Sequence, residues 1–187
     1  MSAPPVLVVP GWTSSGPRHW QTLWERADPG RFRRVEQRDW DNPLREEWVR
    51  TLDGAVAACA APPLLVAHSL GCIAVAHWAA AFARPVAGAL LVAPADVEAA
   101  HAPEPVRDFA PIPLGALPFP SILAASSDDP WLRLDRAEHM ASCWGSNFIR
   151  IEAAGHLNTD AGFGPWPQGE ELLRRLCFSA APDDARV

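Results

Sequence analysis

The chain has 187 residues, 49% of them hydrophobic, which predicts one globular domain over residues 1–187. Its formal net charge of -6 at pH 7 argues against nucleic acid as a partner, because no basic stripe is available to neutralise phosphates. No apolar run approaches the ~20 residues that a membrane helix needs, and the N-terminus lacks a signal-peptide pattern, so we expect a cytoplasmic protein that binds no membrane.

The first half of the chain alternates short apolar runs with helical patterns. A wholly apolar run of four residues is expected of a strand that is buried on both faces of a parallel sheet. A proline suits the first turn of a helix. The predicted elements are a strand at Val6–Val9, a helix from Pro17 to about Ala27, a strand at Phe32–Gln37, a helix from Pro43 to about Cys59, a strand at Leu64–Ala67 and a helix at Leu70–Phe82.

The second half continues the alternation around one proline-rich segment, Pro94 to Pro120, which predicts an ordered loop over one edge of a site. The polar tail, residues 179–187, is expected to fray. Alternating strands and helices predict an α/β fold, a parallel sheet of about six strands with helices on both faces. The remaining predicted elements are strands at Val86–Ala93, Ile122–Ala125 and Phe148–Ile151, and helices from Leu132 to about Trp144 and at Gly169–Cys177.

The strongest local signal is the pentapeptide Ala67-His68-Ser69-Leu70-Gly71, which follows an apolar strand and opens a helix. This is the context of a nucleophile elbow, where the serine stands on a sharp strand-to-helix turn and small residues flank it. The helix that begins near Leu70 places free N–H groups where negative charge would develop. The alternative is that Ser69 only caps that helix.

A nucleophilic serine needs a base, and the base needs an acid to orient it. His156 follows the last predicted strand, and Asp128 and Asp129 follow the fifth one. These side chains would share the carboxyl edge of the sheet with Ser69, in the serine, aspartate, histidine order of α/β-hydrolases. The residues alone leave either aspartate as the acid, because Asp129 before proline is also a good helix N-cap.

Two backbone donors are expected to complete an oxyanion hole. One is the N–H of Leu70, and the other is the N–H of Trp12, beside Gly11 in the loop after the first strand. A plain β-turn is the alternative for that loop. The stiff proline segment and the nearby tryptophans predict a shallow, open pocket for short acyl groups. The residues expected at this pocket are Gly11, His19, Trp20, His68 and Trp131.

Five segments in this order resemble the family of retinoblastoma-binding-protein-9 and YdeN-type serine hydrolases, over about Val6 to Cys177. The resemblance implies a small α/β-hydrolase with a minimal lid and a Ser-Asp-His triad. In that pattern the aspartate directly before proline is the acid, which implies Asp129. The segments are Val8-Val9-Pro10-Gly11-Trp12, Pro17-Arg18-His19-Trp20-Gln21, Ala67-His68-Ser69-Leu70-Gly71, Ser126-Ser127-Asp128-Asp129-Pro130 and Gly155-His156-Leu157-Asn158.

We therefore predict a serine hydrolase that cleaves an ester or related acyl bond of a small-molecule substrate through an acyl-enzyme. The alternative is a protein-binding module on a hydrolase fold with vestigial or secondary activity. A nucleotide-binding domain is disfavoured, since the first loop has neither a GxGxxG nor a Walker pattern. The four cysteines show no zinc spacing, so no metal and no organic cofactor are expected.

Overall fold

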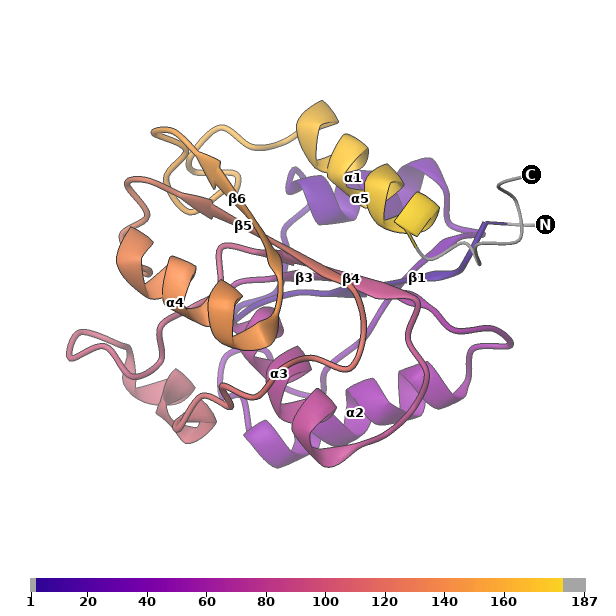
Figure 1. The fold of residues 1–187 in the computed structure, drawn as a ribbon, viewed down its shortest axis with the longest axis horizontal. Coiled ribbons are helices and arrows are strands. Elements are labelled where there is room, and N and C mark those ends of the chain that lie inside the picture. The colour runs from indigo at the N-terminus through magenta and orange to yellow at the C-terminus, as the bar shows by residue number, and fades with distance from the viewer. Residues whose placement is uncertain (1–2, 180–187) are drawn as a thin grey trace.

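A six-stranded sheet runs through the computed structural model, which describes residues 3–179. Its strands lie in the order β2-β1-β3-β4-β5-β6, and every neighbouring pair is parallel (Figure 1). This confirms the predicted α/β fold. The strands are β1 (Val6–Val9), β2 (Phe32–Arg34), β3 (Leu64–His68), β4 (Gly88–Val92), β5 (Ser121–Ser126) and β6 (Asn147–Ile151).

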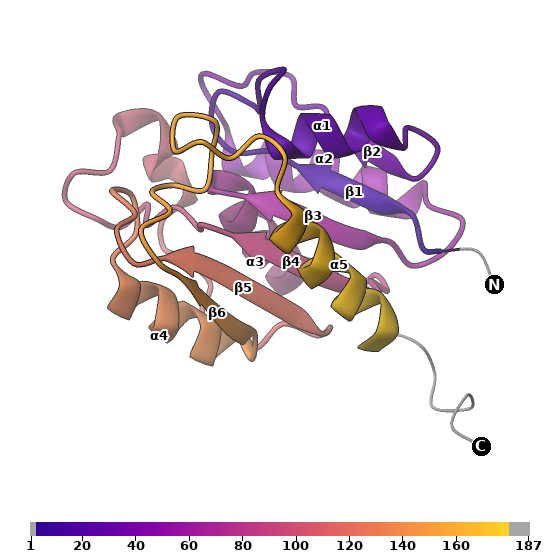
Figure 2. The ribbon, with the colours of Figure 1, turned by 90° about the horizontal axis from the view of Figure 1, so that it is seen from above.

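Helices cover both faces of the sheet (Figure 2). One buried cluster packs α2, α3 and α4 against the sheet, and a second packs α1 and α5 on the other face. The helices are α1 (Trp20–Ala27), α2 (Arg45–Ala57), α3 (Leu70–Ala81), α4 (Leu134–Trp144) and α5 (Pro167–Ser179), with a short 3₁₀ helix, η1, at Glu104–Phe109. Within residues 3–179, none of the helices has the length and apolar character to cross a membrane.

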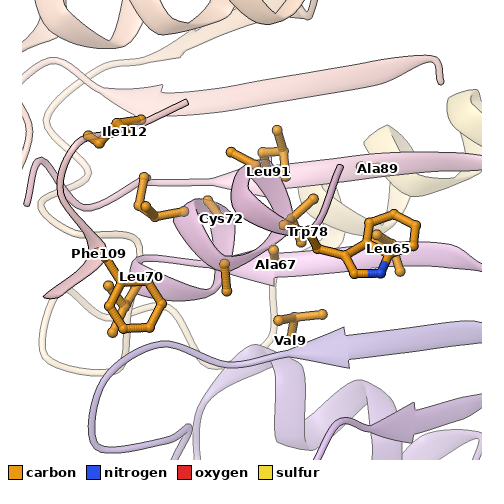
Figure 3. Packing of buried hydrophobic residues seen from close by; sticks show 14 of the residues in the cluster. Val9, Leu65, Ala67, Leu70, Cys72, Trp78, Ala89, Leu91, Phe109 and Ile112 are labelled. Atoms are coloured by element: carbon orange, nitrogen blue, oxygen red, sulfur yellow. The ribbon is translucent and has the colours of Figure 1, made fainter. Parts of the chain in front are cut away.

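The central strands are predominantly apolar because both of their faces are covered. Every residue of β1, β3, β4 and β5 is buried. Figure 3 shows how Leu65 and Ala67 of β3 and Leu91 of β4 lie against Leu70 and Trp78 of α3. Ser69 thus stands between the fully buried strand β3 and the buried first turns of α3.

Helix α1 begins at Trp20 rather than at Pro17, so the predicted start of this helix is wrong. His19 has an extended backbone, and its Nδ1 accepts a hydrogen bond from the N–H of Gln21 at 3.2 Å. This side-chain cap satisfies one of the free N–H groups of the first turn. Pro17 instead stands in a turn that closes with a hydrogen bond from His19 N–H to Gly16 O.

Most other predicted bounds differ from the observed ones by one or two residues, and the larger differences have physical reasons. Strand β2 ends at Arg34 because it is an edge strand that pairs only with the first three residues of β1. Leu44 is extended, so α2 begins at Arg45 and ends before Cys59. The proline-rich segment includes η1 instead of being wholly irregular. Of the predicted tail, Ser179 ends α5, and residues 180–187 lie outside the described residues.

Candidate active site

Ser69 joins β3 to α3 in a backbone conformation that side chains rarely adopt, with φ 54° and ψ -123°. Such strain persists only where the surroundings enforce it. At Gly71 an added Cβ would lie 2.3 Å from the carbonyl oxygen of Val9, and at Gly11 it would lie 2.7 Å from Cβ of Ser69. The turn is therefore so crowded that both positions require glycine.

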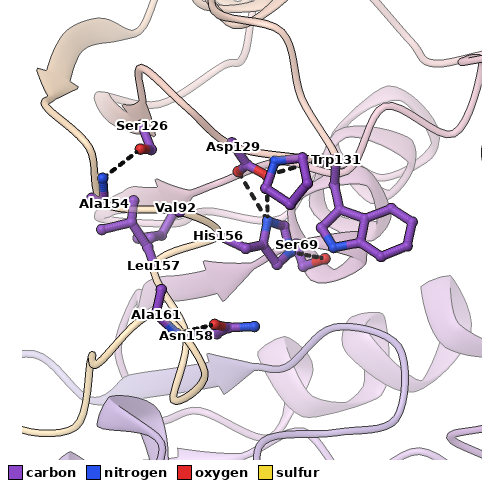
Figure 4. Close-up of polar contacts among 12 residues, drawn as sticks. Ser69, Val92, Ser126, Asp129, Trp131, Ala154, His156, Leu157, Asn158 and Ala161 are labelled. Atoms are coloured by element: carbon purple, nitrogen blue, oxygen red, sulfur yellow. Dashed lines mark hydrogen bonds and ion pairs between the residues drawn. The ribbon is translucent and has the colours of Figure 1, made fainter.

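His156 lies between Ser69 and Asp129 (Figure 4). Its Nε2 is 2.9 Å from Oγ of Ser69. Its Nδ1 is 3.0 Å from Oδ1 and 2.9 Å from Oδ2 of Asp129, whose side chain is completely buried. The three side chains that the sequence places at one edge of the sheet are thus within hydrogen-bonding distance of one another.

The two adjacent aspartates have different partners. Asp129 contacts His156 and also accepts the N–H of Trp131 at 2.8 Å. It is not the cap of α4, because that helix begins only at Leu134. Asp128 accepts the N–H of Gly155 at 2.8 Å and the hydroxyl of Ser126 at 2.7 Å, and these bonds lower the pKa of its carboxyl. Asp128 therefore contacts the loop that carries His156, and not the imidazole.

The backbone N–H groups of Leu70 and Trp12 lie beside Ser69, and neither has a protein acceptor among the described residues. Leu70 is the first residue of α3, so its N–H has no partner inside the helix. The loop after β1 is held in shape by hydrogen bonds from Thr13 N–H to Trp40 O and from Ser14 N–H to Gly11 O. The two N–H groups that the sequence predicts as oxyanion donors are therefore free to bind an oxygen atom.

The comparisons with known proteins decide the family. The model of the serine hydrolase family matches residues 6–175. This chain belongs to the serine hydrolase family. No curated protein sequence matches it.

Solved structures support the same assignment. A putative YdeN-like hydrolase from Pectobacterium atrosepticum is 33% identical, with a TM-score of 0.86 over 96% of this chain and 94% of that chain. The ydeN gene product from B. subtilis is 19% identical, with a TM-score of 0.76 over 94% and 99%. A monoacylglycerol lipase from Paleococcus ferrophilus is 14% identical, with a TM-score of 0.65 over 95% of each chain. The last two show the α/β-hydrolase fold alone, and the family match together with the first structure confirms a YdeN-type serine hydrolase.

A cavity of about 550 Å³ opens onto Ser69 in this serine hydrolase. One wall is mainly apolar and comes largely from the proline-rich segment, with Ala95, Pro103, Val106 and Trp131. The other wall is mainly polar and comes from the loops after β1 and β6. Its polar residues are Thr13, Ser14, Arg18, His19, Asn158, Thr159 and Asp160, and Trp12, Gly16 and Pro17 of the loop after β1 also line it.

Two of the five residues expected at the pocket do not line this cavity. Trp20 is completely buried in the core between α1 and α5, so that prediction is wrong. Gly11 lies behind Ser69 instead of facing the cavity. His19, His68 and Trp131 do line it, as does Trp12.

His19 and His68 are neutral at pH 7. Burial, followed by the charges of Arg34 and His156, lowers the pKa of His19 to about 4. Burial, followed by electrostatic interaction with the imidazoles of His156 and His19, holds the pKa of His68 well below its ordinary value. Neither histidine therefore adds a positive charge beside Ser69 at pH 7.

Sequence analysis missed most of the polar wall. Thr159 and Asp160 lie only three and four residues beyond His156. Their position in the loop that carries His156 could have indicated that they line the cavity. Arg34 was also missed: it donates to Ser14 Oγ and Ser15 O and thereby braces the loop after β1. Within residues 3–179, no group of three or more His, Cys, Asp or Glu side chains is arranged to hold a metal ion.

Proposed function

We propose that this serine hydrolase cleaves carboxylic esters or related acyl bonds of small molecules through an acyl-enzyme on Ser69. The observation that carries the proposal is the continuous chain of contacts from Ser69 through His156 to a fully buried Asp129. A free serine hydroxyl is a weak nucleophile, and an adjacent oriented base activates it. The strained turn exposes that hydroxyl to the cavity.

In the first step, Oγ of Ser69 attacks the acyl carbon and Nε2 of His156 takes the hydroxyl proton. The carbonyl oxygen becomes an oxyanion, which the N–H groups of Leu70 and Trp12 would bind. Asp129 accepts the Nδ1–H of His156, so it fixes the tautomer and stabilises the imidazolium. The imidazolium then gives its proton to the leaving alcohol as the C–O bond breaks.

In the second step, water attacks the acyl-Ser69 ester while His156 takes one of its protons. The tetrahedral intermediate collapses, the carboxylic acid leaves, and the proton returns to Oγ of Ser69. Both steps use the same base and the same oxyanion donors. Among the residues described, the mechanism needs only groups that line the cavity or contact His156.

The two walls of the cavity suggest which part of the substrate lies where. The apolar wall with Trp131 and Val106 suits a short acyl chain, and the polar wall suits a leaving group that carries oxygen or nitrogen. The proposed partner is a small-molecule acyl substrate. We propose no nucleic acid and no membrane as a partner. A cytoplasmic location fits the four free thiols, because such thiols persist in reducing compartments.

A partitioning experiment tests the acyl-enzyme. Several acetate esters with different phenol leaving groups are hydrolysed in water with added methanol, and acetic acid and methyl acetate are measured. A common acyl-enzyme predicts one product ratio for every leaving group, and Ser69→Ala should form neither product above background. Product ratios that change with the leaving group would show direct attack on the substrate and overturn the proposal.

A further inference from the structure

The loop that carries His156 has to reach across the sheet. It leaves β6 at one edge, whereas Ser69 follows β3, and two strands lie between them. At the usual strand spacing this is a distance of roughly 14 Å. Figure 2 shows the segment after β6 returning over the ends of the strands toward α5.

The backbone of this loop is left-handed at alternate residues. Ala153, Gly155 and Leu157 have φ values of 47°, 53° and 50°. For alanine and leucine this left-handed conformation is costly, so it persists only where contacts on both sides enforce it. The loop therefore needs firm anchors if His156 is to keep one position.

The first half of the loop is anchored to the end of β5. Three successive backbone N–H groups donate to side chains there, and each of these bonds is 2.8 to 2.9 Å long. The pairs are Ala153 with Ser127, Ala154 with Ser126 and Gly155 with Asp128. Figure 4 shows the bond between Ser126 and Ala154.

The second half is anchored from the other side, by two buried side chains. Nε2 of His68 lies 2.9 Å from the carbonyl oxygen of His156, and Nε1 of Trp20 donates to the carbonyl oxygen of Leu157, also at 2.9 Å. A carbonyl only accepts, so Nε2 of the neutral His68 must carry its proton. The two donors come from the residue before Ser69 and from the first residue of α1.

We propose that His68 and Trp20 form a carbonyl clamp, a pair of positioning residues that sets the distance between His156 and Ser69. The inference rests on the proposed function of His156 as the base. Because His68 directly precedes Ser69, the clamp ties base and nucleophile to the same end of β3. It acts through the backbone of the loop, and neither residue reacts with the substrate.

Trp20→Phe and Trp24→Phe provide a matched test. Both side chains are buried in α1 and share one core cluster, but Nε1 of Trp24 has no hydrogen-bond partner among the described residues. Both substitutions remove the same atoms, but only Trp20→Phe removes a hydrogen bond of the clamp. Since a misplacement of 1 Å can cost ~10²-fold in rate, kcat for p-nitrophenyl acetate should fall roughly 10-fold or more in Trp20→Phe relative to Trp24→Phe, with little change in KM.

A second pair applies if Trp20→Phe does not fold. His68→Gln keeps an N–H donor, and His68→Leu does not, so the glutamine variant should retain the larger kcat. Equal kcat values within both pairs would overturn the clamp. If Trp20→Phe is unfolded, equal kcat values within the His68 pair alone would overturn it. In either case, an inactive Ser69→Ala would leave the proposed function standing. Full activity of Ser69→Ala would instead overturn the proposed function and the clamp with it.

Discussion

At the scale of single residues, the environment of each polar side chain separates chemical from structural roles. Asp129 and Asp128 are neighbours in the chain, yet one contacts the imidazole of His156 and the other a backbone N–H. Sequence reasoning could place both at the right edge of the sheet. It could not choose between them from spacing, because adjacent residues differ only in the direction of their side chains.

Substitutions at these two positions should have unequal effects. Asp129→Asn should lower kcat by ~10³-fold or more, because loss of the triad acid leaves the base in the wrong tautomer. Asp128→Asn keeps the shape of the side chain and one oxygen acceptor, so its effect should be far milder. Steady-state kinetics on p-nitrophenyl acetate measures both. A larger loss in Asp128→Asn than in Asp129→Asn would reverse the assignment.

The buried His19 should make stability depend on pH. In the unfolded chain its pKa is near 6.5, and in the folded protein it is about 4. The unfolded state therefore binds a proton first as the pH falls, and stability is lost between about pH 6.5 and 4. This single group contributes at most roughly 3 kcal/mol to that loss.

His19→Asn isolates this contribution, because asparagine can still cap α1 but does not titrate. Urea unfolding of both proteins at pH 7 and pH 4.5 gives the free energies of unfolding. The wild type should lose more stability on acidification than the variant does. An equal loss in the two proteins would show that folding does not lower the pKa of His19.

At the scale of elements, apolar patterning predicted the strands well and the helix ends less well. The central strands are buried on both faces, which leaves a run of apolar residues as a clear signal. The start of α1 was misplaced because Pro17 resembles a first-turn proline, whereas the cap comes from His19. A histidine cap has little signature in a single sequence.

The contact between β1 and the start of α3 gives a prediction for these elements. Gly71→Ala would place a methyl group 2.3 Å from the carbonyl oxygen of Val9, so it should destabilise the protein by about 1–3 kcal/mol or more and displace Ser69. Gly54→Ala in α2 is the control, because an added Cβ there meets nothing within 4 Å. That control should be stabilised by up to about 1 kcal/mol. Equal urea-unfolding midpoints in the two variants would contradict this close packing.

At the scale of the whole molecule, the candidate active site joins segments that are distant in the sequence. His68 and the carbonyl of His156 are 88 residues apart, and Trp20 and the carbonyl of Leu157 are 137 apart. The motif for each segment was readable, but the contacts between them depend on how the loop after β6 folds. For this reason Trp20 was expected to line the pocket, although it is an anchor in the core.

The shape of the cavity predicts the preferred acyl length. The segment between β4 and β5 contributes one 3₁₀ helix and no longer helix, so we expect an acyl chain to meet only a shallow apolar surface at Trp131 and Val106. Each methylene should add up to ~0.8 kcal/mol while it is buried and little beyond the wall. Across p-nitrophenyl esters from acetyl to palmitoyl, kcat/KM should therefore level off or fall early. A steady rise to palmitoyl would instead indicate a deep acyl tunnel.

Covalent labelling with a fluorophosphonate tests whether Ser69 is the nucleophile. The probe should add once to the folded wild-type protein, and peptide mass spectrometry should locate it on Ser69. Labelling should be abolished in Ser69→Ala and much slower in His156→Ala, since the base is then missing. Undiminished labelling of Ser69→Ala, or an adduct on another residue, would contradict the account.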